Sequence, residues 1–220
     1  MSDTTATVKY RKDYAPTDFR IDQVHLDFFL EDEYALVTAE LNFSRRTDSN
    51  ATKLFLDGED LELQEIYIDG MALSAEQYLL SDEGLQLLDV AESFVLKTVV
   101  KIQPQLNTSL SGLYKSGSMF CTQCESLGFR RITYFYDRPD CMSAFTCRVE
   151  ADKKKFPILL SNGNEVGRGE NGERHWASFE DPFLKPSYLF ALVAGDLGGI
   201  QGKFTTKSGR DVDLRIWSEH

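Results

Sequence analysis

Several features that would assign a membrane or export role are missing from this sequence of 220 residues. No apolar run approaches the roughly 20 residues that a membrane-spanning helix needs. The first eight residues are small and polar, and no apolar segment follows a basic start, so nothing resembles a secretory signal. The sequence therefore predicts a soluble protein without a membrane partner, and we expect a cytoplasmic location.

Basic surface is also scarce. The formal net charge is −11, and the acidic residues are spread over many short clusters rather than gathered in a tail. The densest basic stretch, residues 153–155, lies next to Asp152 and close to Glu150. A protein that binds a phosphate backbone needs a positive face. We therefore expect no nucleic acid partner, and we interpret the acidic surface as one that favours solubility.

Motifs that carry catalysis are absent as well. The three histidines, His25, His175 and His220, are scattered, and no H-E-x-x-H is present. There is no G-x-S-x-G nucleophile motif, and the glycines between residues 163 and 169 fall among hairpin residues rather than between a strand and a helix. We therefore assign no catalytic residue and no metal ligand to this chain.

Cysteine is present in small number, with four residues in the chain. Cys121 and Cys124 form a C-x-x-C pair, and Cys141 and Cys147 follow with five residues between them. A zinc ribbon needs about two residues between the members of each pair, and a thioredoxin-like dithiol needs a helix after its motif. Reduced, partly buried thiols are the favoured interpretation, with a small zinc or redox domain as an alternative.

Helical periodicity is nearly absent, whereas alternation of apolar and polar residues with period two dominates. A helical turn is expected only at residues 75–80 and after Asp140. Residues 94–102 form the longest strand candidate, and the apolar run 188–194 is typical of a strand covered on both faces. We expect further strands at 24–30, 37–43, 61–68, 145–151 and 212–216. The first two should form a hairpin through the charged turn at residues 31–34, and a tight hairpin turn is expected at Asp69-Gly70.

Many short strands separated by turn signals predict a mainly β fold with very little helix. A β-sandwich or a large twisted mixed sheet with hairpin connections satisfies this pattern. No linker or repeat divides the chain, so residues 1–220 are predicted to form a single domain, with about residues 1–9 flexible. The strand that begins at Asp211 runs to Trp217, and the sequence stops three residues later, so we expect a piece of a longer protein.

The segment from Gly112 to Asp140 stands out, because it is rich in aromatic and charged groups and poor in alternation. A loop of this composition is more typical of a functional segment than of a plain connection. Its motifs, and others along nearly the whole chain, occur in the order and at the spacings of a known family: Tyr10–Tyr14, Leu56–Leu61, Gly112–Tyr114, Cys121–Glu125, Gly128–Arg130, Tyr136–Asp140, Phe145–Thr146, Leu160–Asn164, Asp181–Phe183, Lys185–Pro186 and Tyr188–Asp196.

These motifs resemble the aminopeptidase N family of zinc exopeptidases, and more specifically its bacterial branch. The resemblance implies a saddle-like, mostly β N-terminal domain that packs against a thermolysin-like catalytic domain of the same protein. It also implies that Gln123 and Glu125 line the pocket for the first residue of the substrate, a peptide with a free N-terminus. A carboxylate such as Glu125 binds an α-ammonium group through a charge-assisted hydrogen bond.

The family's zinc-binding H-E-x-x-H helix, its G-A-M-E-N strand and its catalytic tyrosine are all missing here. The resemblance therefore implies that zinc belongs to a catalytic domain outside this chain, and that this chain alone does not hydrolyse peptides. The alternative from another class is a free-standing β-sandwich module that binds a peptide or protein partner.

Overall fold

The computed structural model describes residues 10–220, so the expected flexibility of residues 1–9 lies outside the described residues. Of these described residues, 57% lie in strands and 6% in helix, which confirms the mainly β class. Among residues 10–220, no helix reaches the length and apolarity that crossing a lipid bilayer requires.

The strands and short 3-10 helices follow one another along the chain with the bounds given next. The first half contains η1 (Arg11–Asp13), β1 (Phe19–Leu30), β2 (Ala35–Arg45), β3 (Leu54–Asp57), β4 (Glu62–Ile68), β5 (Met71–Ala72), β6 (Tyr78–Ser81), β7 (Gly84–Leu87), β8 (Ser93–Ile102) and η2 (Pro104–Leu106). The second half contains β9 (Gly112–Ser116), β10 (Met119–Gln123), η3 (Phe129–Arg131), β11 (Met142–Asp152), β12 (Ile158–Ser161), β13 (Asn164–Asn171), β14 (Arg174–Pro186), η4 (Ser187–Leu189), β15 (Leu192–Gly195), β16 (Gly198–Thr205) and β17 (Asp211–Ser218).

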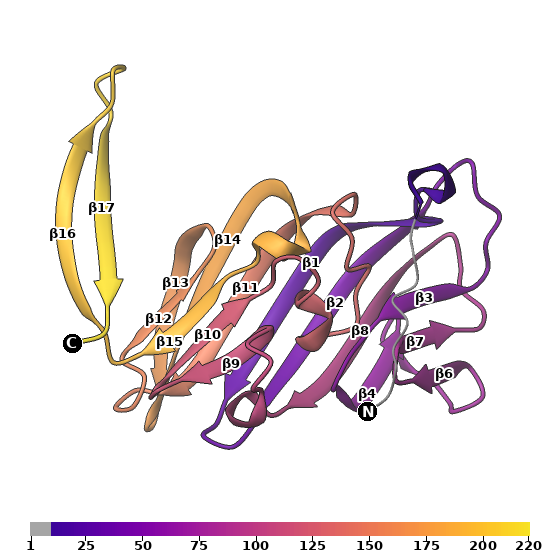
Figure 1. The fold of residues 1–220 in the computed structure, drawn as a ribbon, viewed down its shortest axis with the longest axis horizontal. Coiled ribbons are helices and arrows are strands. Elements are labelled where there is room, and N and C mark those ends of the chain that lie inside the picture. The colour runs from indigo at the N-terminus through magenta and orange to yellow at the C-terminus, as the bar shows by residue number, and fades with distance from the viewer. Residues whose placement is uncertain (1–9) are drawn as a thin grey trace.

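A large twisted sheet of eight strands, in the order β13-β14-β11-β1-β2-β8-β4-β5, forms the main layer (Figure 1). Strands β1 and β11 run parallel and the other neighbours antiparallel, so the sheet is mixed, as expected. The predicted hairpin of β1 and β2 is confirmed, and so is the tight turn between β4 and β5, where Asp69 and Gly70 both have positive φ.

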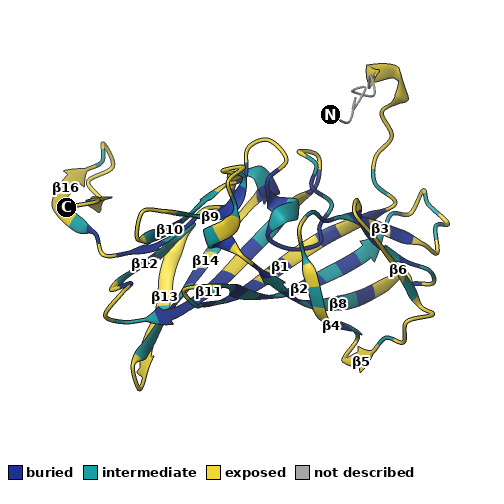
Figure 2. Cartoon of the chain, turned by 60° about the horizontal axis from the view of Figure 1, so that its bottom comes forward, coloured by how far each residue is buried: buried dark blue, intermediate teal, exposed yellow. Residues whose placement is uncertain are grey.

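A four-stranded sheet, in the order β12-β15-β10-β9, forms a second layer over one face of the large sheet, and β3, β7 and β6 form a third, smaller sheet. Strands of the large sheet alternate between buried residues and partly or fully exposed ones (Figure 2). Aromatic rings fill the space between the layers. Phe190 stacks on Phe28 and meets Phe129 edge to face, which places η3 directly on the core.

Three expectations about local structure were wrong. The longest strand is β14, with 13 residues, because a register shift in its pairing with β11 lets it continue past Pro182. Residues 188–194 do not form one strand. Residues 187–189 form η4, and strand pairing begins only at Leu192 in β15. Between them the Asn162 side chain holds the backbone, because it donates to Leu189 O at 3.1 Å and accepts from Ala191 N at 2.7 Å.

The third wrong expectation concerns helical turns. Residues 75–77 form a plain turn, and Tyr78 already begins strand β6. The segment after Asp140 enters strand β11 at Met142 and pairs with β14 there. Pairing with a neighbouring strand determines the backbone conformation of these short segments, because their own sequence has only a weak preference for helix or strand.

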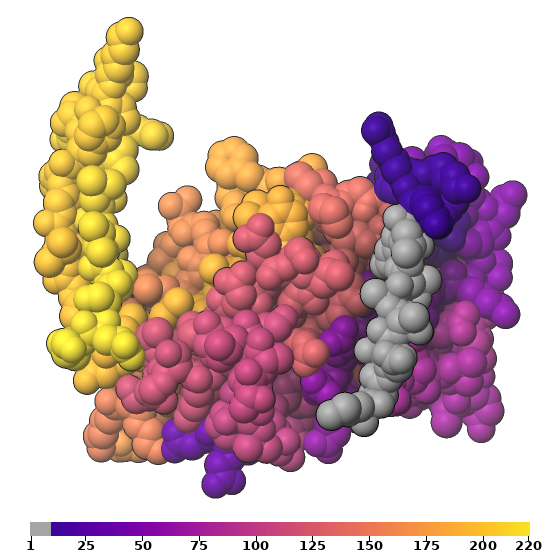
Figure 3. Space-filling model, viewed as in Figure 1, coloured from indigo at the N-terminus to yellow at the C-terminus, as the bar shows by residue number. Residues whose placement is uncertain are grey.

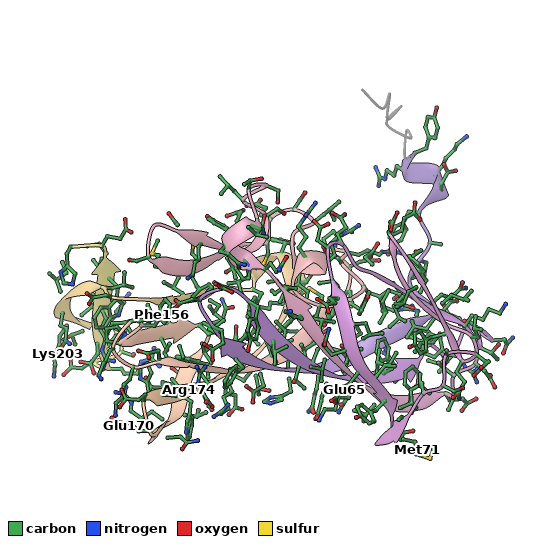
Figure 4. The ribbon with its side chains drawn as sticks, turned by 90° about the horizontal axis from the view of Figure 1, so that it is seen from below. Glu65, Met71, Phe156, Glu170, Arg174 and Lys203 are labelled. Carbon is green, nitrogen blue, oxygen red and sulfur yellow. The ribbon has the colours of Figure 1, made fainter. Side chains whose placement is uncertain are left out.

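The hairpin of β16 and β17 forms a two-stranded sheet of its own and stands apart from the two layers (Figures 1 and 3). One face carries Gln201, Arg215 and Trp217, which line a groove of about 680 Å³ together with β12 and β14. The opposite face is apolar and open to solvent. Figure 4 shows Lys203 of this hairpin at the left end of the molecule, far from Met71 of β5 in the right half of the view.

Candidate functional site

Strand β10 carries the first of the two expected substrate-binding residues. It pairs with β9 on one side and with β15 on the other, and Gln123, opposite Gly112, is its last residue. The hydroxyl of Thr122 accepts a hydrogen bond from Leu192 N at 2.9 Å. The end of β10 is therefore fixed from both neighbouring strands, and Gln123 lies at the edge of a supported sheet.

The chain turns directly after Gln123, and we name residues 123–128 the site turn. Gly128 N donates to Cys124 O at 2.9 Å and closes the turn. Cys124 is buried, whereas Glu125 and the two residues after it are exposed. The peptide bond between Glu125 and Ser126 is cis. Gln123 Nε2 donates to Glu125 O at 3.3 Å, so the structure brings the two expected site residues together.

Two glycines allow the site turn to pack closely on β9. A Cβ on Gly128 would lie 2.5 Å from Gln123 O and 2.8 Å from Ser111 Oγ, both well inside van der Waals contact. Gly112 has φ of +80°, and a Cβ there would lie 2.7 Å from Arg131 Cβ. Positive φ is readily adopted only by glycine. Both positions therefore require glycine for the turn to keep this shape.

A buried charge cluster lies on the inner side of the site turn. Asp137 is 1% exposed, and its Oδ2 accepts hydrogen bonds from Arg130 N at 3.2 Å and Arg130 Nε at 3.1 Å. Its Oδ1 accepts from Ser187 Oγ at 2.8 Å, and Arg130 Nη1 lies 3.3 Å from Asp57 Oδ1. Both Arg130 and Asp137 belong to motifs shared with the family. Their spacing in the sequence did not indicate that their side chains pair.

The next residue, Arg131, fixes the same region to the loop after β3. Its guanidinium pairs with Glu59 at 2.6 Å and also with Asp60. Backbone hydrogen bonds join Asp57 and Phe135 in both directions, at 2.9 and 3.0 Å. The segment that follows the site turn is therefore attached to the small third sheet as well as to the aromatic core.

The four cysteines are free thiols, three of them buried. Burial raises the pKa of Cys124 and Cys147 to about 12 and that of Cys141 to about 11. Burial also raises the pKa of Cys121, which is partly exposed. A redox dithiol or a zinc ligand acts as the thiolate. These environments favour the protonated thiol, which argues against a site built on the C-x-x-C pair.

Two of the three histidines each make one hydrogen bond to a neighbouring strand or loop. His25 Nδ1 lies 2.8 Å from Thr146 Oγ1, and His175 Nε2 lies 2.7 Å from Phe156 O. Within residues 10–220, no group of three or more His, Cys, Asp or Glu side chains is arranged to hold a metal ion. At the site turn, Gln123 and Glu125 are both exposed, so their amide and carboxylate groups are accessible to form hydrogen bonds with a ligand.

Comparison with known proteins gives consistent matches over most of the chain. The sequence profile of the Peptidase M1 N-terminal domain matches residues 20–189. The chain is 52% identical over 206 residues to Aminopeptidase N of Caulobacter vibrioides, which covers 93% of this chain and 24% of that protein. It is 47% identical over 212 residues to Aminopeptidase N of Escherichia coli strain K12, covering 95% of this chain and 24% of the relative.

Solved structures agree with this assignment. A crystal structure of Legionella pneumophila aminopeptidase A in complex with aspartic acid superposes with a TM-score of 0.90 at 30% identity, over 95% of this chain and 25% of that one. An M1 zinc metallopeptidase of Deinococcus radiodurans bound to Tyr-Ser-Ala shares the fold, with a TM-score of 0.76 at 15% identity, over 90% of this chain and 47% of that one. The chain spans about a quarter of the length of the curated relatives. The resemblance noted in the sequence is confirmed, and the chain belongs to the Peptidase M1 N-terminal domain family.

Proposed function

We propose that this chain is the substrate-gripping domain of a zinc metallo-aminopeptidase that removes N-terminal amino acids from peptides. The observation that carries the proposal is the site turn, where the Glu125 carboxylate is exposed on a backbone fixed from both sides. Glu125 accepts the α-ammonium group of the substrate, and Gln123 borders the pocket for its first residue. Relatives named as aminopeptidases support this assignment.

The chemistry of Glu125 explains why the enzyme would act only at free N-termini. A free peptide N-terminus carries an ammonium group, which forms a charge-assisted hydrogen bond with a carboxylate. An acetylated or internal peptide has no such cation and leaves the carboxylate without its partner. Leaving an acceptor unpaired costs about 1–3 kcal/mol, more for a charged group, so discrimination by roughly two decades or more is expected.

The whole protein would extend beyond this domain, since the chain spans about a quarter of its curated relatives. Residues 1–220 would then form one N-terminal β domain, and a further domain would hold the zinc ion. Bound zinc lowers the pKa of a coordinated water to near neutrality, which supplies a hydroxide nucleophile. The present chain supplies recognition, and we expect it to be inactive alone.

The catalytic domain of the same protein is the partner that we propose, and the β16–β17 hairpin is the surface that we expect it to cover. Four large apolar side chains on one face of this hairpin are between 48% and 69% exposed: Ile200, Phe204, Leu214 and Ile216. Exposed apolar surface of this kind marks interaction sites.

A cytoplasmic location remains part of the proposal. Its support is the state of the cysteines, since all four are free thiols and three are buried in the core. Proteins of oxidising compartments use cysteine mainly in disulfides, whereas cytosolic proteins keep their thiols reduced.

The test compares Glu125→Ala with a matched control in the full-length protein. We expect kcat/KM for aminoacyl substrates to fall by about 100-fold or more, because the acceptor for the ammonium group is lost. Glu65→Ala removes an exposed carboxylate from β4, in another part of the molecule (Figure 4), and is expected to leave turnover unchanged. Normal turnover by Glu125→Ala would overturn the assignment of amine recognition to this chain. A full-length protein that hydrolyses no aminoacyl substrate would favour the free-standing interaction module.

A further inference from the structure

The buried cluster on the inner side of the site turn joins three regions that lie far apart in the sequence, and two of its members, Arg130 and Asp137, both come from the segment that follows the turn. Arg130 comes from η3, Asp137 from the loop before β11, Asp57 from the end of β3 and Ser187 from the start of η4. The Asp137 side chain is fully buried, and those of Arg130 and Asp57 are 17% and 26% exposed. The cluster therefore lies inside the domain, whereas Glu125 lies at its surface.

The hydrogen bonds of the cluster form a closed ring. Asp137 binds both the backbone N–H and the side chain of Arg130, and Arg130 Nη2 donates back to Asp137 O at 3.3 Å. Arg130 Nη1 pairs with Asp57, whose Oδ2 accepts from Asp137 N at 3.2 Å. Ser187 Oγ donates to the remaining oxygen of Asp137. Both oxygens of the Asp137 carboxylate are thus used, and each constrains a different segment.

Stability alone is a weak reason for such a cluster. Removing two charges from water costs several kcal/mol per ion, and apolar residues of similar volume often stabilise a core at least as well. A ring of directional hydrogen bonds instead restricts the backbone to one arrangement. The cluster is therefore better suited to fixing the geometry of a segment than to adding stability.

The segment that it fixes leads directly to Glu125. The Arg130 N–H held by Asp137 is two residues beyond Gly128, whose N–H closes the site turn on Cys124 O. At the other end of the turn, Cys124 points inward, and the charge of Asp137 adds to burial in raising the pKa of its thiol. The Asp137 carboxylate thus binds the backbone just after the site turn and acts electrostatically on Cys124 near its start.

We propose that Asp137 is a positioning residue for amine recognition, holding the site turn through Arg130 and Ser187 so that the Glu125 carboxylate meets the substrate ammonium group. This inference rests on the proposed function of Glu125. Misplacement of a binding group by about 1 Å costs up to roughly 100-fold in an enzyme. Asp137 does not touch the substrate, so its loss changes recognition of the amine and leaves binding at the metal intact.

The experiment uses the full-length, zinc-loaded protein and two inhibitors, an α-amino hydroxamate and its counterpart without the amino group. The ratio of their inhibition constants measures amine recognition, and the second compound alone measures the metal site. In Asp137→Asn, which keeps the shape of the side chain and removes its charge, we expect the preference for the amine to fall about tenfold or more. We expect the inhibition constant of the compound without the amine to stay unchanged.

Asp60→Asn is the matched control. Asp60 pairs with Arg131, the neighbour of Arg130, but its side chain is 82% exposed, and its φ of 55° is a conformation that asparagine tolerates. We expect this variant to keep the wild-type preference for the amine. Ser187→Ala removes one hydrogen bond to Asp137 without changing charge, and we expect a smaller fall in the same direction.

The outcomes separate this inference from the proposed function. If Glu125→Ala loses the preference for the amine while Asp137→Asn and Ser187→Ala keep it, Asp137 has no positioning role and the proposed function stands. An equal loss of affinity for both inhibitors in Asp137→Asn also overturns the inference, because it indicates general damage. If Asp137→Asn does not fold, Ser187→Ala decides the matter by the same ratio. A wild-type ratio in Glu125→Ala overturns the proposed function itself.

Discussion

The site turn and the β16–β17 hairpin differ sharply in what surrounds them. The site turn is followed at once by Phe129, a fully buried ring that contacts Phe135, Phe145 and Phe190. The hairpin has its apolar face in solvent, with Phe204 57% exposed. Both segments contain apolar residues, but only the first has a second layer packed against it.

This difference shows what a period-two pattern specifies. In β17 the alternation places Val212, Leu214 and Ile216 on one face, opposite the apolar residues of β16. The same alternation in β11 places Phe145, Cys147 and Val149 on a buried face. Alternation thus determines which side chains share a face, whereas coverage of that face depends on other parts of the fold.

The largest expected effect compares two phenylalanine truncations. Phe129→Ala should lower the free energy of unfolding by about 3–5 kcal/mol, because it leaves a cavity among aromatic rings. Phe204→Ala should change it by no more than about 0.5 kcal/mol, because the ring is already largely hydrated. Urea unfolding of both variants of the 220-residue chain measures the difference. A cost for Phe204→Ala close to that for Phe129→Ala would mean that the hairpin is packed in solution.

The next effect compares two glycines. Gly128→Ala should lower the free energy of unfolding by about 1–3 kcal/mol, because its Cβ would overlap Gln123 O and the backbone must shift. Gly209, at the hairpin tip, has φ of +83° but nothing within 4 Å of a Cβ. Backbone strain at Gly209 should open only the tip of the β16–β17 sheet, because this sheet pairs with no other strand. Gly209→Ala should therefore change the free energy of unfolding of the main domain by no more than about 0.5 kcal/mol.

Hydrogen exchange supplies the check on this second comparison. Gly209→Ala should speed exchange within β16 and β17 and nowhere else, and Gly128→Ala should speed it at the site turn. A broad loss of protection in Gly209→Ala would contradict the view that the hairpin opens by itself.

The sequence predicted the fold where pairing is local. The β1–β2 hairpin and the Asp69-Gly70 turn follow from alternation and turn chemistry over neighbouring residues. The prediction of one strand at residues 188–194 was wrong because an apolar run does not indicate which segment it pairs with. The Asn162 side chain, which is distant in the sequence, forms hydrogen bonds with Leu189 and Ala191 in place of strand pairing. Short apolar runs remain ambiguous for this physical reason.

In the candidate site, too, contacts between residues close in the sequence were predictable and contacts between distant residues were not. Gln123 and Glu125 were expected from the family's motif, and their closeness follows from a single turn. The positions of Ser187 and Asp57 against Asp137 were not predictable, because 50 and 80 residues separate them in the sequence. Contacts of this kind depend on the packing of three sheets, which no local spacing encodes.

The smallest effect on stability, and the sharpest probe of the hairpin, comes from its apolar face. Ile216→Thr keeps a β-branched side chain in β17 and should change the free energy of unfolding by no more than about 0.5 kcal/mol. It should nevertheless lower the fluorescence of a dye that binds apolar surface, because Ile216 and Ile200 lie opposite each other and are 64% and 69% exposed. Leu79→Thr, at an exposed position in β6, is the control and should leave the dye signal unchanged. If the 220-residue chain binds no dye at all, the apolar face is covered by the chain itself or by a second copy, and the contrast between the hairpin and the site turn disappears.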